Sequence, residues 1–173
     1  MIFMNYLNYV RNVLLVTYGD KSTNTIRILY TLNNFPHGAT YTQILNYHTA
    51  FNQSALSRAL QNCLNRNHII YDSAKKVYIS NYFFDTTVMD DDRINWLEKL
   101  LSSRLVGSNT TLIRIVIYLS AVGTIDLNNL AREIQSTMEL TESAILSITD
   151  ELGTEIITYD KNSNQVSANL NWF

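Results

Sequence analysis

The sequence contains one pattern twice, at offsets of 87 to 90 residues. Ile26-Arg27-Ile28 returns as Ile113-Arg114-Ile115, and residues 77–84 are echoed by residues 166–173. Further matches join Asn5-Tyr6-Leu7 to Asn95-Trp96-Leu97, Ser54-Ala55-Leu56 to Ser143-Ala144-Ile145, and Tyr71-Asp72 to Tyr159-Asp160. In a chain of 173 residues this predicts one structural unit used twice. We expect units at 1–88 and 89–173, each marginal alone and packed against the other or a second chain.

The two copies carry opposite net charge. Residues 21–84 contain six Lys or Arg and one acid, a net charge of +5, whereas residues 85–173 contain six bases and thirteen acids, a net charge of −7. Residues 1–20 cancel, with Arg11 against Asp20, which recovers the total of −2. Opposite charge on one repeated scaffold favours two different partners, and a polyanion fits the basic copy.

The remaining composition indicates a globular chain without a membrane segment. Residues 1–16 are apolar but are interrupted by Asn5, Asn8, Arg11 and Asn12, so they predict a buried helix and not a membrane span. The single cysteine, Cys63, cannot form an internal disulfide, which favours a reducing, cytoplasmic location. Frequent Asn, Ile and Tyr are typical of an AT-rich genome such as that of a virus or plasmid.

Each copy predicts the same series of elements: a helix, a second helix, a short capped helix, a longer helix and a two-stranded hairpin. The first copy places them near residues 3–15, 26–32, 40–45, 52–67 and 69–80. The second copy places them after 90–92 and then near 112–119, 126–134, 141–152 and 156–170.

Polar residues at the predicted helix starts support these assignments. Thr40 and Gln43 have the spacing of a capping box, in which each side chain bonds the other residue's backbone N–H. Asn52, Asp126 and Thr141 are the other expected N-caps, because short oxygen-bearing side chains satisfy free backbone donors at helix starts.

This order of elements resembles the winged helix-turn-helix family, over essentially the whole chain and twice. The resemblance implies a mainly α fold with small β-hairpins, of α+β class, made of two tandem winged-helix units that are each preceded by an extra helix. The extra helix is similar to those that build the subunit interface in dimeric winged-helix regulators. We therefore expect a homodimer formed through it.

In winged-helix proteins that bind DNA, the longer helix enters the major groove and the hairpin touches the backbone, which is what the resemblance implies here. The outward stripe of this helix in the first copy is polar and contains no acid, as is suited to base edges and phosphates. An ordinary solvated helix face is also polar, but the absence of acids from residues 21–71 favours DNA. The expected DNA-binding residues are Thr40, Thr42, Gln53, Ser54, Ser57, Arg58, Gln61, Asn65, Lys75 and Lys76.

The equivalent stripe of the second copy is acidic and contains a leucine. Carboxylates beside a phosphate backbone repel it, so this helix is not expected to enter a groove. Glu142, Leu146 and Asp150 are instead the expected protein-interaction residues, with a basic protein as the partner. A solvated acidic face remains the alternative.

The sequence contains no recognisable catalytic or metal-binding pattern. The glycines are scattered singly, so no phosphate-binding loop is present, and no His has a second ligand at metal spacing on its element. His48 and His68 are expected to be caps or surface groups. We therefore expect no enzyme activity, no cofactor and no metal.

Two functions are consistent with these features of the sequence. The first is a transcriptional regulator that reads double-stranded DNA through the first unit; as a twofold dimer it would favour a near-palindromic site with half-sites about 34 Å apart. The alternative is a tandem winged-helix adaptor that binds proteins and no DNA.

Overall fold

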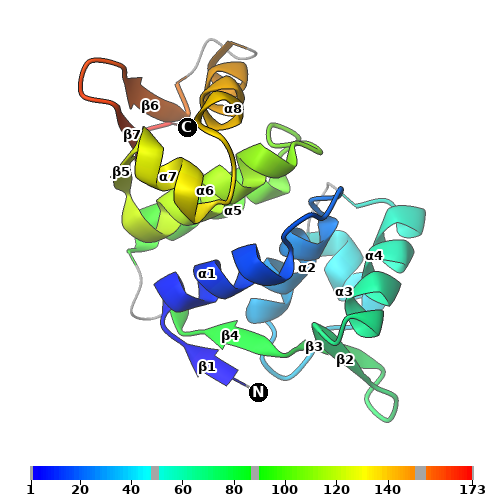
Figure 1. The fold of residues 1–173 in the computed structure, drawn as a ribbon. Coiled ribbons are helices and arrows are strands. Elements are labelled where there is room, and N and C mark those ends of the chain that lie inside the picture. Colours follow the sequence, from blue (N-terminus) through cyan, green and yellow to red (C-terminus); the bar gives the residue numbers. More distant parts are fainter. Residues whose placement is uncertain (1, 48–50, 87–89, 151–154, 173) are drawn as a thin grey trace.

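The computed structural model describes residues 2–47, 51–86, 90–150 and 155–172 (Figure 1). Helices dominate and the strands are short, so the α+β class predicted from the sequence is confirmed. The expected boundary between the two units, at residues 88 and 89, lies outside the described residues.

Among its described residues, the first half of the chain contains four helices and four short strands. They are β1 (Ile2–Met4), α1 (Tyr6–Val16), α2 (Asn24–Asn33), α3 (Tyr41–Tyr47), α4 (Gln53–Asn65), β2 (Ile69–Asp72), β3 (Val77–Ser80) and β4 (Tyr82–Phe84). The second half has a similar order: α5 (Asp91–Ser102), α6 (Thr110–Val122), β5 (Thr124–Asp126), α7 (Leu127–Glu133), α8 (Met138–Asp150), β6 (Ile157–Asp160) and β7 (Gln165–Ala168).

Most predicted helix starts are confirmed by hydrogen bonds. The Thr40 backbone N–H donates to Gln43 Oε1 at 2.8 Å, and the Gln43 N–H donates to Thr40 Oγ1 at 3.2 Å, which completes the capping box. Asn52 Oδ1 accepts from the backbone N–H of Ala55 at 2.8 Å at the start of α4. Asp126 caps α7 in the same way.

Two predicted helix starts are wrong. Phe3 lies in strand β1, and the first helix begins only after Asn5, whose side chain accepts the Asn8 N–H at 2.9 Å. α8 begins three residues before Thr141, because Thr137 Oγ1 accepts the Leu140 N–H at 3.1 Å. Thr141 is buried within the helix.

Three strands were not predicted from the sequence. β1 pairs in parallel with β4, which joins the start of the chain to the end of its first half. β5 adds a third strand to the predicted β6–β7 hairpin, in the order β5-β7-β6. Each of these strands has three residues, which is too short to show an alternating pattern.

The core is continuous across both halves, and one helix from each lies inside it. Residues 25–33 of α2 and 112–120 of α6 are buried at every position, so neither helix has a solvent face. Buried residues of both halves belong to one hydrophobic cluster.

The leading helix α1 packs on α6 inside the chain, which differs from the expected role at a subunit interface (Figure 1). Tyr9, Val10 and Val13 are fully buried. The Tyr6 hydroxyl lies within hydrogen-bonding distance of Ser120 Oγ on α6, and of the Tyr30 hydroxyl at 3.1 Å. Most of the apolar face that we expected to bind a second chain is therefore covered by the chain itself, and Leu15, which is 64% exposed, lies outside the covered part.

Candidate nucleic-acid interface

α4 presents the predicted polar stripe to solvent and its apolar side to the core. Leu56 and Leu60 on the inner side are at most 2% exposed. On the outer side and the hairpin, the exposed candidates are Thr42, Gln53, Ser54, Ser57, Arg58, Gln61, Asn65, Lys75 and Lys76, while Thr40 is half-buried. In Figure 1, α4 and α7 lie on opposite sides of the molecule, and the outer side chains of α4 are exposed to solvent.

Hydrogen bonds order part of this stripe. The Tyr41 hydroxyl donates to the Gln53 carbonyl at 2.8 Å and lies 3.0 Å from Ser57 Oγ, which fixes the start of α3 against the start of α4. One turn along, Gln61 Nε2 donates to Asn65 Oδ1 at 2.9 Å. A DNA ligand would therefore meet polar groups that are already oriented on one rigid helix.

The β2–β3 hairpin is held beside α3 by backbone hydrogen bonds. Ala39 and Tyr78 exchange two of them, at 2.8 and 3.0 Å. At the tip, the Asp72 carboxylate accepts the backbone N–H groups of Ala74 and Lys75, at 3.0 and 3.1 Å. Lys75 and Lys76 thus project from an ordered turn, and Asp72, the one acid of residues 21–84, accepts the hydrogen bonds that shape this turn.

The exposed positive charge of the first half is smaller than its sequence indicates. Arg27 is 2% exposed, and its guanidinium donates into the protein interior. Arg66 forms an ion pair with Asp20, with 2.6 Å between Nη1 and Oδ1. Apart from the ion-paired Arg66, the exposed bases of residues 21–84 are Lys21, Arg58, Lys75 and Lys76.

α8 presents a different surface. Met138, Glu142 and Leu146 follow one another at four-residue spacing, so they share one side of the helix. Met138 is 41% and Leu146 is 38% exposed, and Glu142 lies 4.0 Å from Lys161 Nζ. The side chain of Asp150, the third predicted contact residue here, lies outside the described residues.

Behind α4, Cys63 and His68 are buried. Burial raises the pKa of the Cys63 thiol to about 11, so it stays protonated at neutral pH and is a poor nucleophile. The expectation of a cap or surface role for His68 is wrong: it is 5% exposed, and neither ring nitrogen has a hydrogen-bond partner among the described residues. His48 lies outside those residues.

We expect the burial of His68 to make stability depend on pH. Burial, and secondarily Arg66, lowers its folded pKa below the value of about 6.5 in an unfolded chain. As the pH falls below about 6.5, the unfolded state therefore binds the proton more readily, and the free energy of unfolding decreases.

Urea unfolding between about pH 7.5 and pH 5.5 measures this effect. His68→Phe should flatten the slope and should cost little at pH 7.5, because the imidazole makes no hydrogen bond that phenylalanine would lose. The same change at the exposed His37, His37→Phe, is the control and should leave the slope intact. If the slope of stability against pH is unchanged in His68→Phe, His68 is not the cause of the pH dependence.

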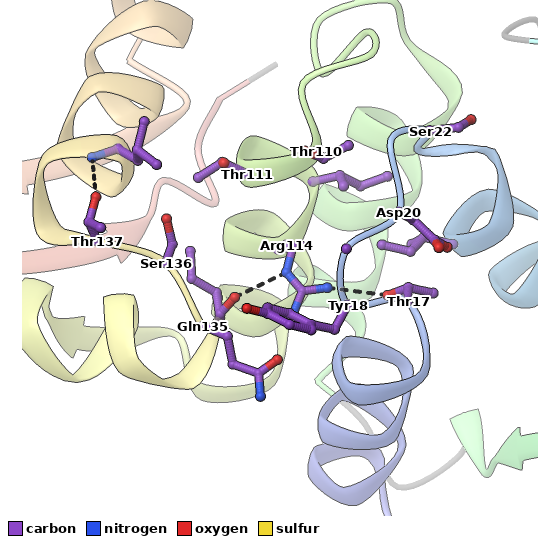
Figure 2. A pocket seen from close by; sticks show the side chains of 15 residues that line it. Thr17, Tyr18, Asp20, Ser22, Thr110, Thr111, Arg114, Gln135, Ser136 and Thr137 are labelled. Carbon is purple, nitrogen blue, oxygen red and sulfur yellow. Dashed lines mark hydrogen bonds between the residues drawn. The ribbon is translucent and has the colours of Figure 1, made fainter.

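A site that the sequence did not reveal surrounds Arg114, at a pocket of about 520 Å³ between the end of α1 and the starts of α6 and α8 (Figure 2). The guanidinium donates to the carbonyls of Leu14 at 2.9 Å and Ile134 at 3.1 Å, and to Thr17 Oγ1 at 3.2 Å. All three guanidinium nitrogens therefore donate to acceptors of the protein itself, so Arg114 stabilises the wall of the pocket. The available signal was the repeated Ile-Arg-Ile triplet inside an apolar helix.

Within the described ranges, no group of three or more His, Cys, Asp or Glu side chains is placed to hold a metal ion. No helix among these residues has the length and apolar character to cross a membrane. Comparison with protein-family models, with curated proteins and with solved structures finds no significant match.

Proposed function

We propose that this chain is a non-enzymatic DNA-binding protein that reads double-stranded DNA through α4 and regulates transcription. Its architecture would be two tandem winged-helix units, of which the first binds the duplex. One observation carries the proposal: α4 exposes an acid-free row of hydrogen-bonding side chains beside an ordered hairpin tip with two lysines. Such a protein acts where its target DNA is, in the cytoplasm of a cell without a nucleus or in the host cell of a virus.

The dimensions of α4 suit a major groove. Its 13 residues span roughly 20 Å, and a single helix fits a groove about 12 Å wide. Arg58 and Gln61 are one turn apart and belong to the side-chain types that bond guanine and adenine edges. The lysines at the hairpin tip would neutralise phosphates and set the position of the helix without reading sequence.

Arg58→Ala is expected to lower affinity for a preferred duplex by about 1–3 kcal/mol and to relax the choice of base at one position. Lys75→Ala should instead weaken binding to all duplexes alike and reduce the salt dependence of log K by about one. Fluorescence anisotropy titrations against selected and random duplexes at several salt concentrations measure both effects.

Arg132→Ala is the matched control, because Arg132 is an exposed arginine on α7 in the other half. It should bind both duplexes like the unmodified protein. If Arg58→Ala and Lys75→Ala also bind like the unmodified protein, α4 and its hairpin are not the DNA-binding face.

A protein-binding adaptor is the second candidate, favoured by the exposed Met138 and Leu146 on α8. Its partner would be a basic protein, because Glu139 and Glu142 lie on the same helix. In this case the full chain would show no salt-dependent affinity for duplex DNA, and Leu146→Lys would abolish copurification of a basic partner. A Leu146→Lys variant that retains every partner would count against the adaptor.

A further inference from the structure

We infer that one chain is an internal pair, with its halves related by an approximate twofold axis, so that a single copy binds an asymmetric duplex site. The inference rests on the proposed function for its DNA ligand, and on the packing of the two halves for its stoichiometry. It replaces the expectation of a homodimer on a palindrome.

Two buried arginines join the halves reciprocally. Arg114 of α6 donates to the Leu14 carbonyl near the end of α1, at 2.9 Å. Arg27 of α2 donates to the Leu101 carbonyl near the end of α5, at 3.1 Å. Both donors and both acceptors differ by 87 positions (27 to 114 and 14 to 101), so the core arginine of each half holds the leading helix of the other.

The surroundings of the arginines correspond as well. A pocket of about 500 Å³ beside Arg27 matches the one of about 520 Å³ beside Arg114. Lining residues that correspond at an offset of 87 include Arg27 and Arg114, Thr23 and Thr110, and Thr17 and Arg104. Thr17 and Arg104 are chemically different, yet they line the two pockets at corresponding positions of the two halves.

The larger arrangement is consistent with an approximate twofold relation. The fully buried stretches of α2 and α6, 25–33 and 112–120, are also 87 positions apart. The turn between β2 and β3 and the turn between β6 and β7 lie at opposite ends of the molecule (Figure 1). The match is not perfect, since α6 packs closely on both α1 and α5, whereas α2, its counterpart in the first half, packs closely on neither.

This pairing changes the expected DNA target. Because α1 and α5 bury their apolar faces within the chain, those faces are not available to a second copy. Of the two corresponding outer helices α4 and α8, α4 contains no acid, whereas α8 carries Glu139 and Glu142 among its described residues. One chain therefore offers one reading helix, which covers about one turn of duplex and imposes no symmetry on it.

Sedimentation velocity of the full chain, alone and with DNA, tests the inference. The probes are a duplex that carries a site selected from a random pool, and a duplex with two inverted copies of it about 10 base pairs apart. We expect a free mass of 19.9 kDa, a 1:1 complex on the single site, and two independent binding events of equal affinity on the inverted pair. Leu15→Glu, at the exposed apolar position of α1, should change none of these.

Three other outcomes of this experiment would each overturn the inference, the proposed function or both. A free mass near twice the chain mass, reduced by Leu15→Glu, would show that the chain pairs with a second copy and would overturn the inference. Cooperative binding of two copies to the inverted pair would also overturn it while leaving the proposed DNA binding intact. A monomer that binds no duplex, even at low salt, would overturn the proposed function and the asymmetric target with it.

Discussion

Arg114→Ala is expected to lower the free energy of unfolding by about 3–5 kcal/mol, in the upper range for single substitutions. The change removes a buried side chain and leaves three acceptors, Leu14 O, Ile134 O and Thr17 Oγ1, without a donor. Each buried acceptor that loses its partner costs about 1–3 kcal/mol, and partial relaxation limits the sum. Urea unfolding followed by circular dichroism measures the loss.

Two further variants make this result specific. Arg27→Ala should destabilise by a similar amount, because Arg27 donates to Leu101 O and Gly107 O in the corresponding place. Arg132→Ala removes an exposed arginine and should change stability by no more than about 0.5 kcal/mol. A loss below about 1 kcal/mol in Arg114→Ala would contradict the idea that buried arginines join the two halves.

Gly38→Ala is the second substitution with a large expected effect, a loss of about 2–5 kcal/mol. Gly38 has φ +99°, which L-residues rarely adopt, and an added Cβ would lie 2.5 Å from Val77 Cγ2. Val77 begins β3 beside the hairpin tip, so the clash pushes directly on the segment that carries Lys75 and Lys76. Thermal or urea unfolding measures the change in stability.

Gly19→Ala separates the cost of the positive φ from the cost of the clash with Val77. Gly19 also has a positive φ, +81°, but nothing lies within 4 Å of an added Cβ, so only the backbone cost of about 1–2 kcal/mol applies. Equal losses in the two variants would show that the hairpin does not press on Gly38. A larger loss in Gly38→Ala, accompanied by weaker binding to all duplexes, is the expected result.

The helices and hairpins were predictable because their signals are local. Side-chain oxygens at Asn52 and Asp126 mark helix starts, and the Thr40–Gln43 capping box forms as predicted. The hairpin predicted near residues 69–80 forms there, with strands at 69–72 and 77–80 on either side of a polar turn. The exposure of the α4 stripe followed in the same way from helical periodicity.

The features that the sequence did not predict depend on contacts between residues far apart in the chain. Nothing near residues 2–4 indicates pairing with β4, and a formal count of charges does not reveal that Arg27 is buried or that Arg66 pairs with Asp20. Such contacts join residues far apart in sequence, which periodicity and capping rules do not describe. The winged-helix assignment, the duplication and the DNA ligand remain predictions from sequence.

The most direct measurement is photo-crosslinking of the full chain to duplex DNA from one position on each long outer helix. A photoreactive residue replaces Gln61 on α4 in one protein and Ser147 on α8 in another, both of which are exposed. Crosslinking from position 61, lost as salt is raised, with none from position 147, is the result we predict. Crosslinking from position 147 alone, or from neither position at low salt, would contradict DNA recognition by the first half.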